Sequence, residues 1–118
     1  SPMQEKTTGN KAESIASEFL AKHQISIVER NYRIDGGEVD LIARDKDVWI
    51  FVEVKYRANE KFASILEQIT PQQCRRIRYT ARHYLMTHNI DEHTAAIRFD
   101  VIGISGGSLN IEWIKDAF

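Results

Sequence analysis

The chain has 118 residues, of which 42% are hydrophobic and 28% are charged, so it fits one globular domain rather than a disordered or multidomain chain. No apolar run reaches the roughly 18 to 20 residues of a membrane span, nothing at the start resembles a signal peptide, and the single cysteine, Cys74, favours a reducing compartment such as the cytoplasm. The formal net charge of -1 gives no global argument for a nucleic-acid partner, so that case must rest on local clusters of basic residues.

The chain is expected to divide into a short tail and one domain. Residues 1–8 are polar and are predicted to form a disordered tail, whose first two residues resemble a remnant of cloning. No repeat, low-complexity tract or linker follows, so residues 9–118 are expected to fold as a single unit.

A helix and then a strand are predicted at the start of this unit. Asn10 suits a helix N-cap, and Glu13 follows three positions later, as in a capping box. Apolar residues recur at helical spacing over residues 12–20 and predict an amphipathic helix that ends near His23. The rise in β-branched and aromatic residues over 25–33 then indicates a first strand.

Two stronger strands follow and are expected to form a hairpin. Residues 38–43 alternate between apolar and polar side chains, and residues 48–55 are almost continuously apolar until the last three. The polar residues 44–47 between them are typical of a short turn, so the two strands should pair in antiparallel fashion.

The second half of the chain contains one clear helix. Residues 56–69 fit either a short strand or a helical turn. Thr70 and Gln73 then predict a helix start with a complete capping box, and this helix should fade near His88. Two more strands are predicted, at residues 97–104 and 109–114. The elements together indicate an α/β domain with a central mixed β-sheet flanked by helices.

The unusual chemistry lies at the end of the central hairpin. A turn centred between residues 46 and 47 places Asp40 opposite Glu53, with Cβ atoms about 4.5–5.5 Å apart. It also places Glu38 opposite Lys55. Two facing carboxylates repel each other unless a cation lies between them, and Mg²⁺ takes one or two carboxylates while keeping waters that substrate phosphates displace. Such an ion lowers the pKa of a bound water, which Lys55 could position or deprotonate. The alternative is an exposed, charge-paired strand edge.

A stripe of basic residues follows this hairpin in the sequence. The helix after Thr70 contains four arginines and no acidic residue. Arg75, Arg78 and Arg82 fall at helical spacing and should line one face, to which Arg57 could add. Such a stripe suits the phosphate backbone of a nucleic acid. The alternative is an ordinary solvated helix face.

Three segments closely resemble motifs of the YraN-like family, namely Gly37–Ile42, Phe51–Arg57 and Arg98–Val101. This bacterial family of uncharacterised proteins has a predicted endonuclease fold and is similar to the PD-(D/E)xK nuclease superfamily, near archaeal Holliday-junction resolvases. The match extends from about Gly9 to Phe118. The resemblance implies a restriction-endonuclease-like domain.

The same resemblance implies hydrolysis of the phosphodiester bonds of DNA, including branched or junction DNA, with Mg²⁺ or Mn²⁺ as cofactor. The implied catalytic residues are Asp40, Glu53 and Lys55, and the implied metal ligands are Asp40, Glu53 and the carbonyl of Val54. Glu13 matches the acidic residue that many resolvase-like nucleases bring from their first helix to the metal. Its alternative role is the capping box described above.

Three further residues have expected supporting roles. Glu38 should either act on the site through a neighbour or pair with Lys55 at the surface. Members of the resembled family often carry a lysine in the first turn of the long helix, where this chain has Gln73. Asp100 is expected to form a structural ion pair with Arg98.

Two functions therefore stay open from the sequence. The first is a metal-dependent endonuclease with DNA as its partner. The second is a non-catalytic nucleic-acid-binding or scaffolding protein on the same fold. A homodimer is expected to be possible in either case, because resolvase-like nucleases often cut two strands symmetrically.

Overall fold

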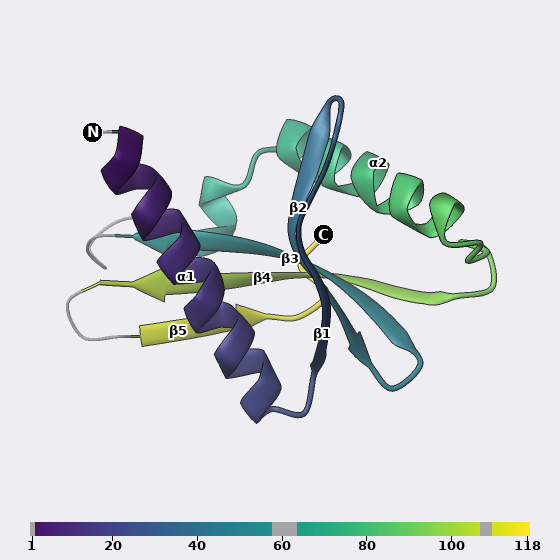
Figure 1. Cartoon of the computed structure of the whole chain (residues 1–118), viewed down its shortest axis with the longest axis horizontal. Coiled ribbons are helices and arrows are strands. Elements are labelled where there is room, and N and C mark those ends of the chain that lie inside the picture. Colours follow the sequence, from purple (N-terminus) through teal and green to yellow (C-terminus); the bar gives the residue numbers. More distant parts are fainter. Residues whose placement is uncertain (1, 58–63, 107–109) are drawn as a thin grey trace.

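The computed structural model describes residues 2–57, 64–106 and 110–118, which form one mixed sheet covered by a helix on each face (Figure 1). The elements in chain order are α1 (Pro2–Lys22), β1 (Ser26–Ile34), β2 (Gly37–Asp45), β3 (Val48–Arg57), the short 3₁₀ helix η1 (Ile65–Gln68), α2 (Pro71–Thr87), β4 (Ala96–Ser105) and β5 (Asn110–Ile114). The strands lie in the order β1-β2-β3-β4-β5, and only β3 and β4 are parallel. This arrangement confirms the predicted α/β fold of restriction-endonuclease-like architecture.

Helix α1 begins earlier than the sequence suggested. It starts at Pro2, so residues 2–8 belong to the helix instead of a separate tail. Asn10 lies inside the helix, and the capping box predicted between Asn10 and Glu13 was therefore wrong. Gln4, Glu5 and Lys6 are good helix formers, but Thr7, Thr8 and Gly9 directly before Asn10 are not, so local propensity does not explain this extension. The predicted end near His23 agrees with the last helical residue, Lys22.

Helix α2 begins as predicted. The backbone N–H of Gln73 donates to Thr70 Oγ1 at 3.1 Å, and the backbone N–H of Thr70 donates to Gln73 Oε1 at 2.9 Å. Its buried side chains pack against the face of the sheet that carries Phe51 and Phe99. Helix α1 packs against the opposite face through the core around Leu20. The two helices thus cover the two faces of the sheet, and loops and strand ends form its edges along the strand direction.

The pairing of β2 with β3 has the predicted register. Leu41 pairs with Val52, and the ladder runs from there to the turn at residues 46 and 47. Asp40 precedes Leu41 on β2 and lies one residue beyond the end of this ladder. Val39 packs with the α2 core whereas Leu41 packs with the α1 core, so the strict alternation expected for β2 breaks at this point. Asp40 therefore lies where elements from both sides of the sheet come within reach.

The far end of the β1–β2 hairpin packs against α2, as Figure 1 shows for β2. Gly37 makes this approach possible, because a Cβ atom there would lie 2.1 Å from Thr80 Oγ1. Only a residue without a side chain fits such a contact. The hairpin end and the start of α2 consequently enclose a space between them, which the next section describes.

The remaining strands also follow the sequence pattern. Strands β4 and β5 form an antiparallel pair close to the predicted ranges, although residues 107–109 of the connecting turn lie outside the described part of the chain. The ambiguous segment 56–69 contains η1, and its residues 58–63 are likewise outside the described part. Among the described residues, no helix is both long and apolar enough to cross a bilayer.

Asp100 forms the predicted ion pair with Arg98 and also accepts hydrogen bonds from two other segments. Its carboxylate is fully buried and accepts hydrogen bonds from Arg98 Nε at 2.8 Å, from Trp113 Nε1 at 2.9 Å and from the backbone N–H of Asp116 at 2.9 Å. These three donors come from β4, from β5 and from the segment after it. The buried carboxylate thus ties the C-terminal strand to the sheet.

Candidate functional site

Asp40 and Glu53 meet where β2 leaves β3. Asp40 is buried, and its Oδ2 accepts a hydrogen bond from the backbone N–H of Val54 at 2.8 Å. This bond fixes the carboxylate against the next strand. The half-buried carboxyl group of Glu53 forms a hydrogen bond with the carboxyl group of Asp40. The structure thus brings together the two carboxyl groups that the hairpin register places opposite each other.

The surroundings of Glu53 favour its neutral form. Burial, the hydrogen bond with Asp40 and the charge of Asp40 raise the pKa of Glu53 to about 9, and the charge of Lys55 opposes this rise. At neutral pH the two carboxyl groups therefore hold one proton between them. A group in that proton's place must also be positively charged.

Helix α1 supplies a third carboxyl group. Burial and the charge of Asp40 raise the pKa of Glu13, while a hydrogen bond with Asn31 lowers it. Glu13 lies in the middle of α1, so no N-cap role competes with this placement. Asn31 was missed by sequence reasoning. Its left-handed backbone, with φ of 52°, is a conformation in which Asn is enriched, yet the residue type alone did not show that it would reach Glu13.

A cavity of about 610 Å³ opens beside this acid cluster, between the hairpin end and the first turns of α2. We call it the acid cavity; its polar lining consists of Arg33, Glu38, Glu53, Lys55, Gln73 and Arg76. Sequence reasoning placed Lys55 and Gln73 close to the site but did not single out Arg76. The signal for Arg76 was its position one helical turn after Gln73.

Two lining residues are already engaged. Glu38 pairs with Arg33 at 2.7 Å, which corrects the expected surface pair with Lys55. The reason is the β1–β2 register, which places Arg33 directly opposite Glu38. Gln73 has its side-chain oxygen in the capping box with Thr70. Lys55 is therefore the cation that acts on the charge of Glu53.

The carboxyl groups suit Mg²⁺ more than a metal with a closed protein shell. Among the described residues, no three His, Cys, Asp or Glu side chains already form a metal-binding group. Mg²⁺ does not need one, because it binds one or two carboxylates and completes its shell with water and substrate. Asp40 and Glu53 provide that pair, Glu13 lies within electrostatic reach of Asp40, and Lys55 balances charge beside them. The carbonyl of Val54 stays a predicted ligand.

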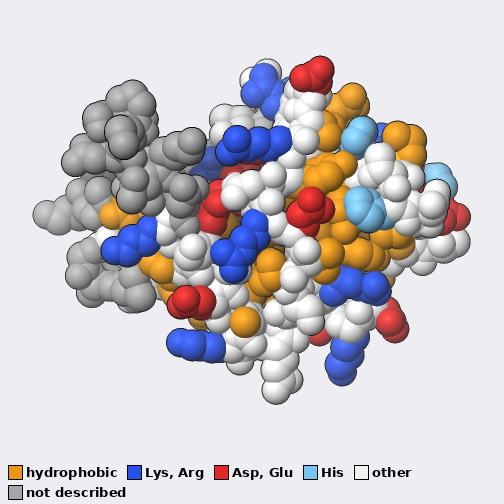
Figure 2. Space-filling model, viewed as in Figure 1, with side chains coloured by type: hydrophobic (Ala, Val, Ile, Leu, Met, Phe, Trp, Pro, Cys, Tyr) orange, Lys and Arg blue, Asp and Glu red, His pale blue; other side chains and the backbone are white. Residues whose placement is uncertain are grey.

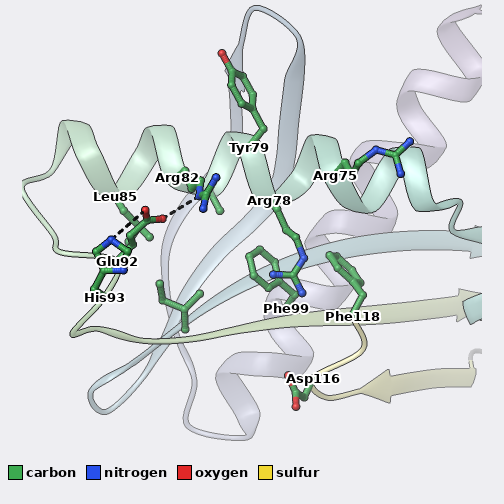
Figure 3. A pocket seen from close by; sticks show the side chains of 12 residues that line it. Arg75, Arg78, Tyr79, Arg82, Leu85, Glu92, His93, Phe99, Asp116 and Phe118 are labelled. Carbon is green, nitrogen blue, oxygen red and sulfur yellow. Dashed lines mark hydrogen bonds and ion pairs between the residues drawn. The ribbon is translucent and has the colours of Figure 1, made fainter.

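The predicted arginine stripe faces a different cavity. Arg75, Arg78 and Arg82 all line a space of about 600 Å³ on the other side of α2 (Figure 3). Arg57 lies at the end of β3 and is not among its lining residues. Figure 2 shows acidic and basic side chains interspersed on the visible face, without a single broad basic patch. Basic side chains therefore cluster only locally, as around the cavity beside α2.

Comparisons with known proteins identify the family. The model of the uncharacterised protein family UPF0102 matches residues 12–104. A UPF0102 protein of Idiomarina loihiensis is 66% identical over 116 residues, which cover 98% of this chain and 100% of the relative. A UPF0102 protein of Shewanella oneidensis is 43% identical over 112 residues, covering 95% and 99% respectively. One from Aliivibrio salmonicida is 40% identical over 109 residues, covering 92% and 89%. The chain therefore belongs to the uncharacterised protein family UPF0102, the YraN family that its motifs resemble.

Proposed function

We propose that this protein is a metal-dependent nuclease that hydrolyses phosphodiester bonds of DNA. The observation that carries the proposal is the pair of carboxyl groups of Asp40 and Glu53, which share a proton beside Lys55 at an open cavity. Structural ion pairs bring opposite charges together, whereas this pair places like groups together at a cost in stability. Such costs are typical of functional sites.

Each residue has a distinct role in this proposal. Asp40, held by the N–H of Val54, offers its carboxylate in a fixed position. Glu53 would have to release its proton to hold a divalent cation together with Asp40. The bound ion would supply a polarised water and neutralise charge on the scissile phosphate. Lys55 would orient that water by donating a hydrogen bond from its ammonium group, which lies beside Glu53.

The start of α2 provides the phosphate contacts. Arg76 lines the acid cavity, and a guanidinium group binds phosphate oxygens through two parallel hydrogen bonds. Gln73 lies in the first turn of α2, where the helix dipole carries a partial positive charge. A DNA phosphate in this cavity would thus meet positive charge from α2 and the carboxyl groups from β2 and β3.

One observation favours the alternative of a nucleic-acid-binding protein without turnover. Gln73, at the position where the family resemblance implies a lysine, has no charge, and its side-chain oxygen is held by the helix cap. A cation that would stabilise the transition state is therefore missing from this position. The alternative keeps the same fold and the same arginines but expects no cleavage.

A cleavage assay on labelled single-stranded, duplex, flapped and four-way-junction DNA tests the proposal. We expect cutting with Mg²⁺ or Mn²⁺, none with chelator, and a loss of about 100-fold or more in Asp40→Asn and Lys55→Ala. Glu112→Gln, which removes an exposed carboxylate on β5, is the matched control and should cut normally. DNA binding by folded protein without any cutting would support the alternative. Equal cutting by Asp40→Asn would contradict the proposed site.

A further inference from the structure

A second cavity lies along α2, away from the acid cavity, and we call it the arginine cavity (Figure 3). Its volume of about 600 Å³ falls within the usual range for small-molecule sites. Arg75, Arg78 and Arg82 line it from α2, and Phe99 and Phe118 line it from β4 and the C-terminus. Arg76 faces the acid cavity instead. Helix α2 therefore separates the two cavities and contributes arginines to both.

The stacking surface of the arginine cavity consists of Arg78 and the partly exposed Phe118, because the Phe99 ring is buried under Arg78 and against Phe118. The Arg78 guanidinium lies over the Phe99 ring, 4.6 Å from its centroid, and 5.8 Å from the centroid of Phe118. The two phenylalanine rings are themselves stacked, with centroids 5.3 Å apart. Leu85 and Ile97 add apolar surface. Flat cations and aromatic rings in one place suit a flat, partly apolar ligand.

The cavity is lined by three arginines and two carboxylates, Glu92 and Asp116, so the charge of its lining is positive on balance. Glu92 is engaged by Arg82 at 2.9 Å and lies 3.8 Å from His93. Within the described part of the chain, neither Arg75 nor Arg78 forms an ion pair. The ligand that fits is therefore both flat and anionic.

We infer that the arginine cavity holds an unpaired nucleobase of a bound strand while Arg75 and Arg78 contact its phosphates, an inference that rests on the proposed nuclease function. A phosphate alone gains nothing from Phe99, Phe118 and Leu85, because these side chains offer it no hydrogen bond. A base within an intact duplex cannot enter, since both of its faces are already stacked. Single-stranded or flapped DNA is thus the substrate class.

The position of the cavity relative to the acid cluster bears on this assignment. Phe99 pairs with Phe51 across β3 and β4, and their rings stack with centroids 5.7 Å apart. Glu53 follows Phe51 by two residues on the same strand, about 7 Å further along. The carboxyl groups therefore lie near the arginine cavity but on the other side of α2, so a strand whose base enters this cavity must cross α2 to reach them.

Binding measurements in chelator, which prevents metal-dependent cutting, test the inference without relying on activity. Fluorescence anisotropy would compare a labelled oligothymidylate with an abasic deoxyribose-phosphate oligomer of equal length and charge, and with duplex. The wild type should bind the oligothymidylate about fivefold or more tightly than the abasic oligomer. Phe118→Ala should bring that ratio close to one and leave binding of the abasic oligomer unchanged.

Two further variants separate base stacking from charge. Arg78→Ala should weaken both oligomers and reduce the salt dependence of binding by about one phosphate contact. Lys22→Ala removes one charge from the exposed end of α1 and should change neither affinity. Thermal unfolding confirms that each variant is folded. Because Phe118 and Arg78 are replaced in separate proteins, a folding defect in one leaves the other as a test.

Several outcomes would overturn the inference. The first two are equal binding of the two oligomers by the wild type and an equal loss of binding for both oligomers in Phe118→Ala. The third is the absence of any DNA binding. The fourth is displacement by a polyglutamate peptide that is as effective as displacement by oligothymidylate, which would indicate a site for an acidic peptide. Base-dependent binding without cutting would refute hydrolysis and leave the cavity assignment intact. Cutting without base-dependent binding would refute the cavity assignment and leave the proposed hydrolysis intact.

Discussion

The acid cluster should make the protein less stable as pH rises, and Glu53→Gln should remove this effect. Burial and Asp40 raise the pKa of Glu53 from 4.5 to about 9. In the unfolded chain the carboxyl group ionises at its ordinary pKa, so between these two values the folded state holds a proton that the unfolded state lacks. The stabilisation is complete below pH 4.5 and is lost as pH rises towards 9. Glutamine cannot ionise, yet its amide still donates a hydrogen bond to Asp40.

The size of the effect on stability follows from the difference between the pH of the measurement and the ordinary pKa of Glu53. Each pH unit between the two pKa values costs about 1.4 kcal/mol of unfolding free energy, so about three units at pH ~7.5 give an upper limit of about 4 kcal/mol. Glu53 is only half-buried, and solvent reduces this figure. We expect Glu53→Gln to be more stable than the wild type by about 1–3 kcal/mol at this pH, which is a large part of a small domain's total stability.

Urea unfolding in chelator, repeated at several pH values from about 5 to about 9, measures this difference directly. The two proteins should have nearly equal stability at the acidic end, and the gap should widen as pH rises. Glu112→Gln is the control for loss of an exposed carboxylate and should follow the wild type. Parallel curves for the wild type and Glu53→Gln would refute the shared proton and with it the electrostatic basis of the site.

Three other predictions follow from the same structure. The affinity for Mg²⁺, measured by calorimetry, should rise up to tenfold per pH unit from about pH 6 to about pH 8, because Glu53 must release its proton; a pH-independent affinity would contradict this. Gly37→Ala should lower unfolding free energy by about 1–3 kcal/mol, since the new Cβ meets Thr80 Oγ1, and Thr80→Ala in the same chain should restore part of it. Asp100→Asn should cost about 3–5 kcal/mol in urea unfolding by leaving Arg98 without its buried partner, and a change below about 1 kcal/mol would contradict that role.

Much of this fold could be predicted because its signals are local. The capping box of Thr70 and Gln73 involves residues three positions apart, and the hairpin register depends on a short turn. Both were confirmed. The predicted start of α1 was wrong, because Asn10 resembles a cap but lies inside a helix that begins at Pro2.

Most of the contacts in the site that were not predicted join distant parts of the chain. The exception is the pair of Glu38 and Arg33, which lies across the two-residue turn of Asp35 and Gly36 and could have been predicted from it. The hydrogen bond from Val54 to Asp40 arises where β2 departs from β3, a feature that strict alternation does not contain. The aromatic surface beneath Arg78 needs the C-terminal Phe118 to return to β4. These last two contacts do not follow from spacing along the chain.

The central claim is that Asp40 and Glu53 support hydrolysis of DNA, and one measurement tests it most directly. Flapped DNA would be incubated with the protein and Mg²⁺ in water enriched in heavy oxygen, and the products analysed by mass spectrometry. We predict cut strands that carry one heavy oxygen at the new phosphate end, and none with chelator or with Asp40→Asn. Uncut DNA with folded wild-type protein, or labelled products formed equally fast by Asp40→Asn, would contradict the claim.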